Sequence, residues 1–454
     1  MTFISPLQSV QAKFCIMKIG SQIRLAEVGA INALKSCSSV KDLQMFSKQD
    51  GNLLISRALE LMMFSGNVKE VANDFWVNPS THIYDEIAFS PLATPANVLN
   101  FWQDPVIEPA LADWTPIKNY LLEVICNGKA ELYDYLIRYL AHMVQKPGQK
   151  PGVMLVMLGA QGTGKGTFFR LLREIWARTC LQVNDVDDVI GRFNASLEHN
   201  FVICMDEALF AGDKKSIEKL KSLITEEVIR TEQKMQPKRT IASYHRFFAA
   251  SNNDHFAHVD ADDRRFVFFR VSSSRQGDRG YWAKLSQSLK DPVQLSGMMQ
   301  ELSSIDLSDF DVTRRPNTEE NLAQKIRSLN GFERYWYELI YTGLFPTISN
   351  GGGNVWDGPI FIATSTLQEG FKNYDRQAER YRPIQADKIR SSIKRICPSA
   401  AQGRCNTLKI RGYYLPSLTK ARSEFEQYIG GKPDWDACDV GDASCASKTS
   451  VEPE

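Results

Sequence analysis

The feature that most constrains the fold of this chain is an apolar stretch at 153–158 followed directly by the glycine-rich segment GAQGTGKGT at 159–167. The apolar stretch has the length of a buried strand, and the glycines permit a tight turn between a strand and a helix. In such a phosphate loop, backbone N–H groups at the helix start face an anion, and the lysine contacts the β and γ phosphates. The residues predicted to bind the phosphates are Gly159, Gly162, Thr163, Gly164, Lys165, Gly166 and Thr167.

One position departs from the usual pattern G-x-x-x-x-G-K-[S/T]. Gly166 occupies the place of the hydroxyl residue that normally holds a magnesium ion, and Thr167 follows one residue later. The pattern therefore predicts a nucleotide site but leaves open whether Thr167 contacts the metal.

A second apolar stretch at 201–205 ends in the acidic pair Asp206 and Glu207. Hydrolysis of ATP needs a carboxylate in the magnesium shell and a group that takes a proton from the attacking water. We expect Asp206 to hold Mg²⁺ and Glu207 to act as the base. The alternative is two solvated acids at a strand end.

Further along the chain, a strand expected at 247–250 leads to Asn252, which is a candidate sensor of the γ-phosphate or of the attacking water. Arg264 and Arg265 precede another apolar strand at 266–269. An arginine supplied by a neighbouring subunit can neutralise charge on the transferred phosphoryl group, so Arg265, or else Arg264, is the candidate finger. The alternative is that both arginines pair with the acids at 260–263.

Residues 228–246 read as two apolar arms around a basic tip, which predicts a hairpin inserted before the sensor strand. Basic tips of this kind can follow a phosphate backbone without reading bases. Lys234, Lys238 and Arg239 are the candidate DNA contacts, and a merely solvated hairpin is the alternative.

Composition bounds the class of protein. The chain has 454 residues, 43% of them apolar, and a net charge of +1. It contains no apolar run near the roughly 20 residues that cross a bilayer, and its start lacks a signal-peptide core, so a location in the cytoplasm of a bacterial host and no membrane partner are expected. The nine cysteines show no zinc-ligand spacing.

Alternating strands and helices after the phosphate loop predict an α/β fold with a mainly parallel sheet. A basic segment at 372–422 precedes an acidic tail, and is expected to bind duplex or forked DNA. The predicted divisions are an N-terminal region of unknown role (1–98), a helical collar (99–150), the ATPase core (151–272), a helical extension (273–346), a linker (347–359), a winged-helix-like basic domain (360–430) and a disordered acidic tail (431–454).

The order GAQGTGKG, FVICMDEA, basic hairpin, FFAASN and DDRRFVFF resembles the superfamily 3 helicases, most closely the helicase portion of phage, plasmid and poxvirus-type primase-helicases. The resemblance covers about 101–429. It implies an AAA+ core, a homo-oligomeric ring that is usually a hexamer, ATP and Mg²⁺ as cofactors, and a single DNA strand in the pore with Lys234 on the pore hairpin. Members with glycine after the loop lysine are familiar in that family.

Two other functions are left open by the sequence. The first is a replication initiator that melts or marks DNA without processive unwinding. The second, suggested by the string GKGT, is a nucleoside monophosphate kinase, although no acid pair, sensor and arginine pair follow in this order in those enzymes. The region before the collar lacks a convincing catalytic triad of acids, so we expect a separate primase or other replication proteins as partners.

Overall fold

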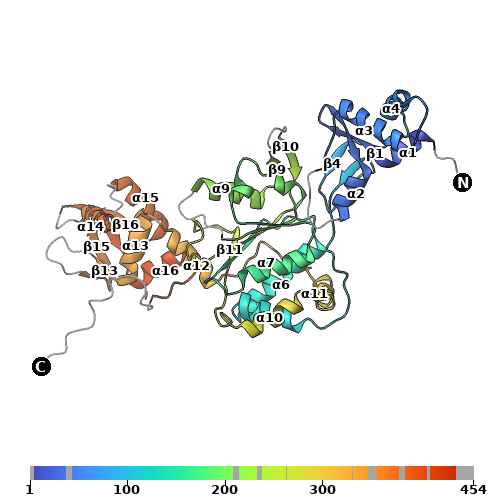
Figure 1. The fold of residues 1–454 in the computed structure, drawn as a ribbon. Coiled ribbons are helices and arrows are strands. Elements are labelled where there is room, and N and C mark those ends of the chain that lie inside the picture. The colour runs from blue at the N-terminus through green and yellow to red at the C-terminus, as the bar shows by residue number, and fades with distance from the viewer. Residues whose placement is uncertain are drawn as a thin grey trace. The chain divides into compact units, whose positions relative to one another are not determined.

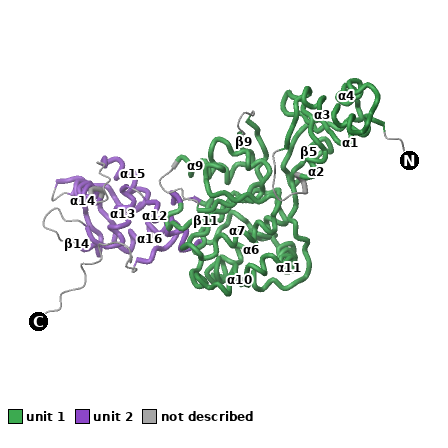
Figure 2. Tube along the Cα trace, in the orientation of Figure 1, with its two compact units in different colours: residues 1–256, 264–316 green, residues 257–263, 317–454 purple. Residues whose placement is uncertain are grey.

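The computed structural model describes residues 5–36, 43–207, 214–232, 238–261, 263–329, 331–345, 354–377, 384–405 and 409–435. The chain divides into two compact units, which Figure 2 shows in different colours. The first comprises residues 1–256 and 264–316, and the second comprises 257–263 and 317–454. The division at 316 falls inside the segment 273–346 that sequence analysis treats as one helical extension.

A five-stranded parallel sheet forms the centre of the first unit. Its strands, in spatial order, are β12 (Phe266–Arg270), β6 (Met154–Leu158), β11 (Arg246–Ser251), β8 (Val202–Met205) and β7 (Cys180–Val183). The three middle strands are buried along their whole length, as expected for a parallel sheet covered on both faces. The predicted α/β class with a parallel sheet is therefore confirmed.

Helices cover this sheet on both sides (Figure 1). α7 (Lys165–Ile175), α6 (Ala130–Gln145) and α11 (Pro292–Ser304) lie on one side, and α9 (Lys214–Thr225) lies on the other. Residues of α6, α7 and α11 belong to the same hydrophobic cluster as the sheet, so the segment before the phosphate loop and the segment after β12 share one core. The remaining elements here are α5 (Thr115–Asn119), the π-helix η1 (Tyr120–Ile125), α8 (Asp187–Ile190), η2 (Ala195–His199), β9 (Val228–Thr231), β10 (Arg239–Ala242) and α10 (Arg279–Ser288).

Apolar residues spaced three and four apart over 117–145 predict a continuous helical segment, but this segment is interrupted. Asn127 and Gly128 both have positive φ, of 51° and 73°, and separate η1 from α6. A left-handed Asn-Gly pair is a turn signal, and here it overrides the apolar periodicity that runs through it. The first part of the predicted helical extension is likewise two helices, Arg279–Ser288 and Pro292–Ser304, because Asp291 caps the second and Pro292 begins it.

The first hundred residues build two small hydrophobic clusters of their own. Strand β1 pairs with β2 in a hairpin and with β3 in parallel, while β4 pairs in parallel with β5. The elements are α1 (Pro6–Lys13), β1 (Phe14–Ile19), β2 (Gln22–Glu27), α2 (Val28–Ser36), α3 (Lys48–Leu61), α4 (Val68–Val77), β3 (Ile83–Tyr84), β4 (Glu86–Ala88) and β5 (Val98–Asn100).

The second unit packs helices around a three-stranded antiparallel sheet with the order β15, β17, β16. Gly412, between two apolar stretches at 408–415, predicts a turn between strands, and this expectation is wrong. Gly412 lies inside β17, where a Cβ atom would come within 2.1 Å of the Ile362 carbonyl oxygen on β15. The elements are α12 (Glu319–Ser328), α13 (Gly331–Thr342), β13 (Leu344–Phe345), β14 (Asn354–Val355), β15 (Ile360–Ala363), α14 (Thr364–Gln377), α15 (Ala386–Ile396), β16 (Ala401–Arg404), β17 (Arg411–Leu415) and α16 (Leu418–Ile429).

The predicted tail lies largely outside the described residues, and so do residues 347–353 of the predicted linker. The rest of the linker prediction is wrong in part, because Asn354–Val355 pair with β13 and Trp356 is buried. Trp435, however, is described: its indole N–H donates to Glu426 and its ring lies 5.0 Å from the Arg422 guanidinium. The packed chain therefore extends past Gly430, where sequence analysis places the start of the tail.

Candidate functional site

The phosphate loop joins β6 to α7 at the carboxyl edge of the sheet. Gly162 and Gly164 have φ values of 78° and 105°, which favour glycine. At Gly164 a Cβ atom would also lie 2.4 Å from the Trp282 ring. Within the described residues, no backbone N–H from Gly162 to Gly166 donates to a protein acceptor. These open donors and the positive end of α7 form a site for an anion.

Lys165 is buried and its side chain folds back over the loop. Its Nζ donates to the carbonyl oxygens of Gly159 and Ala160, at 2.6 and 2.8 Å, and to Oδ1 of Asn252 at 2.7 Å. Burial lowers the pKa of the Lys165 ammonium, and the carboxylates of Asp206 and Glu207 act against that shift. A bound anion would replace these neutral acceptors with a charged one, which is the stronger partner.

The predicted acidic pair ends β8 and faces the same space. Asp206 accepts hydrogen bonds from the Gln182 amide at 3.2 Å and from the Glu207 backbone N–H at 3.1 Å. Glu207 is exposed and has a φ of 54°, a conformation that costs free energy for a residue with a side chain. Strained backbone of this kind is concentrated at functional sites.

Sheet order explains why Asn252 joins this group. Strand β11 lies between β6 and β8, so its carboxyl end lies between the phosphate loop and the acidic pair. Ligands of open parallel sheets bind outside the carboxyl ends of the strands. The candidate sensor therefore reaches Lys165 from a third strand.

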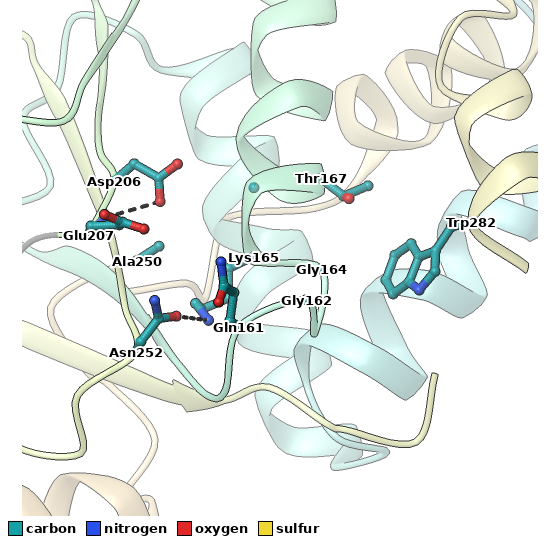
Figure 3. Close-up of a pocket in the computed structure, with 11 residues that line it drawn as sticks. Gln161, Gly162, Gly164, Lys165, Thr167, Asp206, Glu207, Ala250, Asn252 and Trp282 are labelled. Atoms are coloured by element: carbon teal, nitrogen blue, oxygen red, sulfur yellow. Dashed lines mark hydrogen bonds between the residues drawn. The ribbon is translucent and has the colours of Figure 1, made fainter. Parts of the chain in front are cut away.

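These residues line one cavity of about 410 Å³ (Figure 3). It brings together five of the seven predicted loop residues, both acids and Asn252, while Gly159 and Thr163 do not line it. It adds Gln161, Ala250 and Trp282, which were not among the predicted site residues. The lining residues are Gln161, Gly162, Gly164, Lys165, Gly166, Thr167, Asp206, Glu207, Ala250, Asn252 and Trp282.

The two residues at the unusual position of the motif differ in surroundings. Gly166 is exposed, and a Cβ atom there would meet no atom within 4 Å. The Thr167 side chain points away from Asp206 and toward the side of the cavity where Trp282 lies (Figure 3). Direct contact of Thr167 with a metal held by Asp206 thus has no support from this arrangement.

The candidate arginines lie at the other edge of the sheet. Arg265 precedes β12, and its carbonyl oxygen accepts a hydrogen bond of 2.8 Å from the N–H of Met154, the first residue of β6. The loop begins after the last residue of β6, roughly 16 Å further along at about 3.3 Å per residue. Neither Arg264, which is exposed, nor the half-buried Arg265 lines the cavity of its own chain.

The predicted hairpin is formed by β9 and β10, which pair antiparallel. Lys234 lies outside the described residues. Arg239 forms an ion pair of 3.0 Å with the buried Glu198, and Lys238, which is exposed, forms one of 3.2 Å with Glu232. Both described basic residues are thus held by acids of the same chain.

Neither a membrane-spanning helix nor a preformed metal cluster is present among the described residues. No helix there is both long and apolar enough to span a membrane. No cluster of three or more His, Cys, Asp or Glu side chains there could hold a metal ion by itself. A metal in the cavity would depend on Asp206 together with ligand oxygens, which is the usual way proteins bind Mg²⁺ beside phosphates.

Comparison with known proteins places these features in context. A family of unknown function, DUF5906, matches residues 157–265, a segment that runs from β6 to Arg265. The chain is related to the DNA primase-polymerase of Nitratiruptor phage NrS-1, with 28% identity over 163 residues that make up 33% of this chain and 22% of the phage protein. The match therefore spans about a fifth of that relative.

Solved structures share the fold over most of the chain. The apo structure of the NrS-1 C-terminal region has a TM-score of 0.61 with 15% identity, covering 90% of this chain and 99% of that one. A second apo structure of the same region, its A form, has a TM-score of 0.60 with 15% identity and covers 89% and 97%. At this identity the likeness concerns the fold alone.

Proposed function

We propose that this protein is an ATP-dependent DNA helicase that acts in the replication of a phage, satellite or plasmid. The observation that carries the proposal is the single cavity in which a phosphate loop, an acidic pair and an asparagine meet from three neighbouring strands. The sequence relative named a DNA primase-polymerase supports DNA as the partner and replication as the context.

The residues have separate roles in this proposal. The open N–H groups of the loop and Lys165 bind the phosphates, and Glu207 takes the proton from the attacking water while Asn252 orients it. Asp206, positioned by Gln182, would hold Mg²⁺, which supplies charge neutralisation on the phosphate oxygens.

Assembly into a homo-oligomeric ring, as in the AAA+ superfamily 3 helicases, is part of the proposal. The support is the position of Arg264 and Arg265, which lie at the sheet edge opposite their own cavity. From that edge an arginine serves a neighbouring subunit more readily than its own. The β9–β10 hairpin would face a DNA strand in the pore. Residues 360–430 would serve as the winged-helix-like domain that grips duplex or forked DNA, and a separate primase would act with the ring.

A second candidate, an initiator that melts DNA without processive unwinding, is favoured by one observation. Lys238 and Arg239 are engaged by Glu232 and Glu198, which reduces the charge that the described part of the hairpin offers to DNA. A weak grip suits a switch better than a translocase.

Strand displacement on a forked DNA, measured together with ATPase activity, tests the proposal. We expect single-stranded DNA to stimulate hydrolysis and the wild type to release the displaced strand. Glu207→Gln is the matched control: it should lower kcat by about 10²- to 10⁴-fold and still bind ATP. Hydrolysis without displacement at any salt concentration would favour the initiator, and absence of ATP binding would overturn both.

A further inference from the structure

The cavity has two chemically different ends. The acids and Asn252 lie at one end, where hydrolysis is proposed, and Trp282 of α10 lies at the other, across the phosphate loop (Figure 3). If the γ-phosphate of a nucleotide is directed toward Glu207 and Asn252, its sugar and base have to leave the loop at the opposite end. The indole is the aromatic group found there.

Trp282 is held firmly in this position. Its Nε1–H donates to the Arg275 carbonyl oxygen at 2.8 Å, and its ring lies against the backbone of Gly164. The rings of Tyr120 and Tyr281 meet it edge to face, with interplanar angles of 78° and 81°. Neither of these two described rings is therefore stacked parallel on the face of the indole.

Residues next to Trp282 also hydrogen-bond to the backbone of the phosphate loop. The Tyr120 hydroxyl donates to the Gly164 carbonyl oxygen at 2.9 Å, and the Gln276 amide donates to the Gln161 carbonyl oxygen at 2.8 Å. The segment that follows β12 therefore fixes both the loop backbone and the indole. A half-buried aromatic ring fixed beside a phosphate site is suited to stack on a planar base.

We propose that Trp282 is the platform on which the base of the bound nucleotide stacks, and that it sets which nucleoside triphosphates this site accepts. The inference rests on the proposed function of the cavity and deepens it. Every base has a π-face, so stacking discriminates by ring size rather than by the hydrogen-bonding edge.

Selectivity should therefore be broad. Among the described residues that line the cavity, the polar side chains besides the acids and Asn252 are those of Gln161, Lys165 and Thr167, all within 159–167, and the Trp282 indole itself. Purine triphosphates should bind better than pyrimidine triphosphates because they overlap more of the indole. We expect the affinities for ATP and GTP to lie within about tenfold of each other, which is a small difference in binding free energy.

Calorimetric titration of the full chain with ATP and with inorganic tripolyphosphate, both in Mg²⁺, tests the inference. Trp282→Ala should weaken ATP binding by about 5- to 140-fold, from the usual contribution of stacking on an aromatic side chain. It should leave tripolyphosphate binding unchanged, because that probe has phosphates but no base. Trp282→Phe should retain most of the ATP affinity.

The outcomes separate the inference from the function on which it rests. If the wild type binds neither ATP nor tripolyphosphate, the nucleotide site itself is wrong. If the wild type binds both and Trp282→Ala weakens both equally, the indole supports the loop and does not stack on the base. A preference for ATP over GTP of more than about a hundredfold would also overturn the inference, since edge-reading contacts would then dominate.

Discussion

The two edges of the central sheet use the same residue type in different ways. At the carboxyl edge, Lys165 donates three hydrogen bonds, to Gly159, Ala160 and Asn252, and Lys165 and Asn252 both line an open cavity. At the amino edge, Lys150 also makes three: its acceptors are Leu223 O, Glu226 O and Ser243 Oγ.

At the amino edge, where the parallel strands begin, the basic side chains are hydrogen-bonded to acceptors of the chain itself. The fully buried Arg246 donates to the carbonyl oxygens of Tyr244, Lys146, Pro147 and Gln149, and its guanidinium lies 5.0 Å from the Phe201 ring.

Burial lowers the pKa of Lys150 to about 7 and that of Arg246 to about 10. These groups close the turn that leads into β6.

The difference teaches what separates a ligand site from a packing cluster. Both edges have buried basic groups hydrogen-bonded to main-chain oxygens. At the amino edge the chain itself supplies the partners. At the carboxyl edge it leaves N–H donors of the loop without acceptors and places the half-buried Asp206 and the exposed Glu207 opposite them. Open donors, and not the presence of charge, mark the site.

The largest effect is expected for Arg265, which lies at the amino edge. A catalytic role for Arg265 would contradict the division into a catalytic carboxyl edge and a purely structural amino edge. If Arg265 acts on the cavity of a neighbouring subunit, Arg265→Ala should lower ATP turnover by about 10³- to 10⁵-fold and leave nucleotide binding intact. Turnover measured in mixtures with Glu207→Gln subunits checks the assignment, since a mixed interface regains one complete site.

The neighbouring arginine is the matched control. Arg264→Ala should have the smaller effect if Arg265 is the finger, and the reverse result would exchange their roles. Failure of any mixture to regain activity, with assembled rings verified by light scattering, would argue against a finger supplied in trans.

The paired lysines sharpen the comparison directly. Lys165→Ala should lower ATPase activity by about 10²- to 10³-fold, the usual cost of removing one preorganised donor. Lys150→Ala should leave kcat unchanged and lower the free energy of unfolding by about 1–3 kcal/mol, because partly buried acceptors lose their donor. Denaturant unfolding and steady-state ATPase assays on both variants would contradict this division if the two effects were exchanged.

Acid should weaken the amino edge selectively. Buried His245 accepts from, or donates to, Ser243 Oγ through Nδ1 at 2.8 Å and contacts the Leu197 carbonyl oxygen through Nε2 at 2.9 Å. Burial lowers its pKa to about 4 from 6.5, so the unfolded chain binds a proton first as the pH falls. The neutral state of His245 therefore contributes fully to the free energy of unfolding above about pH 6.5. This contribution, on the order of 3 kcal/mol, is lost as the pH falls toward 4.

Unfolding by urea at a series of pH values measures this loss. Burial also lowers the pKa of His142 to about 4, so protonation of His142 destabilises the protein over the same pH range. The wild-type curve alone therefore does not assign the loss of stability to one histidine. The comparison with His245→Gln does, because that variant should show a shallower dependence on pH. Identical slopes would exclude His245 as the source.

Much of the carboxyl edge was predictable from the sequence because its parts are local. The phosphate loop, the acids after an apolar strand and Asn252 after another each follow from short patterns, and parallel strands bring their ends together. Gln182 and Trp282 were missed, since each reaches the site through packing between segments distant in the sequence.

The hairpin and the helices show where periodicity misleads. The hairpin itself was predicted correctly, but the pairing of Arg239 with Glu198 depends on a contact that no spacing signals. The break at Asn127 and Gly128 did have a local signal, and the apolar spacing of the helices on either side obscured it. Contacts made by tertiary packing, and turns inside periodic stretches, are thus the parts that sequence patterns lose.

The smallest expected effect concerns the glycine that makes the phosphate loop unusual. Because a side chain at Gly166 would meet no atom within 4 Å, serine fits there and restores the hydroxyl of the common motif. If Asp206 alone holds the metal on the protein side, an added neutral ligand should lower the Mg²⁺ concentration for half-maximal ATPase activity by about 2- to 12-fold, the equivalent of one ordinary hydrogen bond.

Gly166→Ala separates the hydroxyl from its side effects. Alanine has the same Cβ and a larger gain in helix propensity than serine, but no oxygen. Magnesium titration of ATPase activity should therefore shift for Gly166→Ser and not for Gly166→Ala. Equal shifts in the Mg²⁺ requirement would mean that the flexibility of Gly166 in the first turn of α7, and not a missing hydroxyl, weakens metal binding. No shift in either variant would mean that the carboxyl edge already has a second metal ligand.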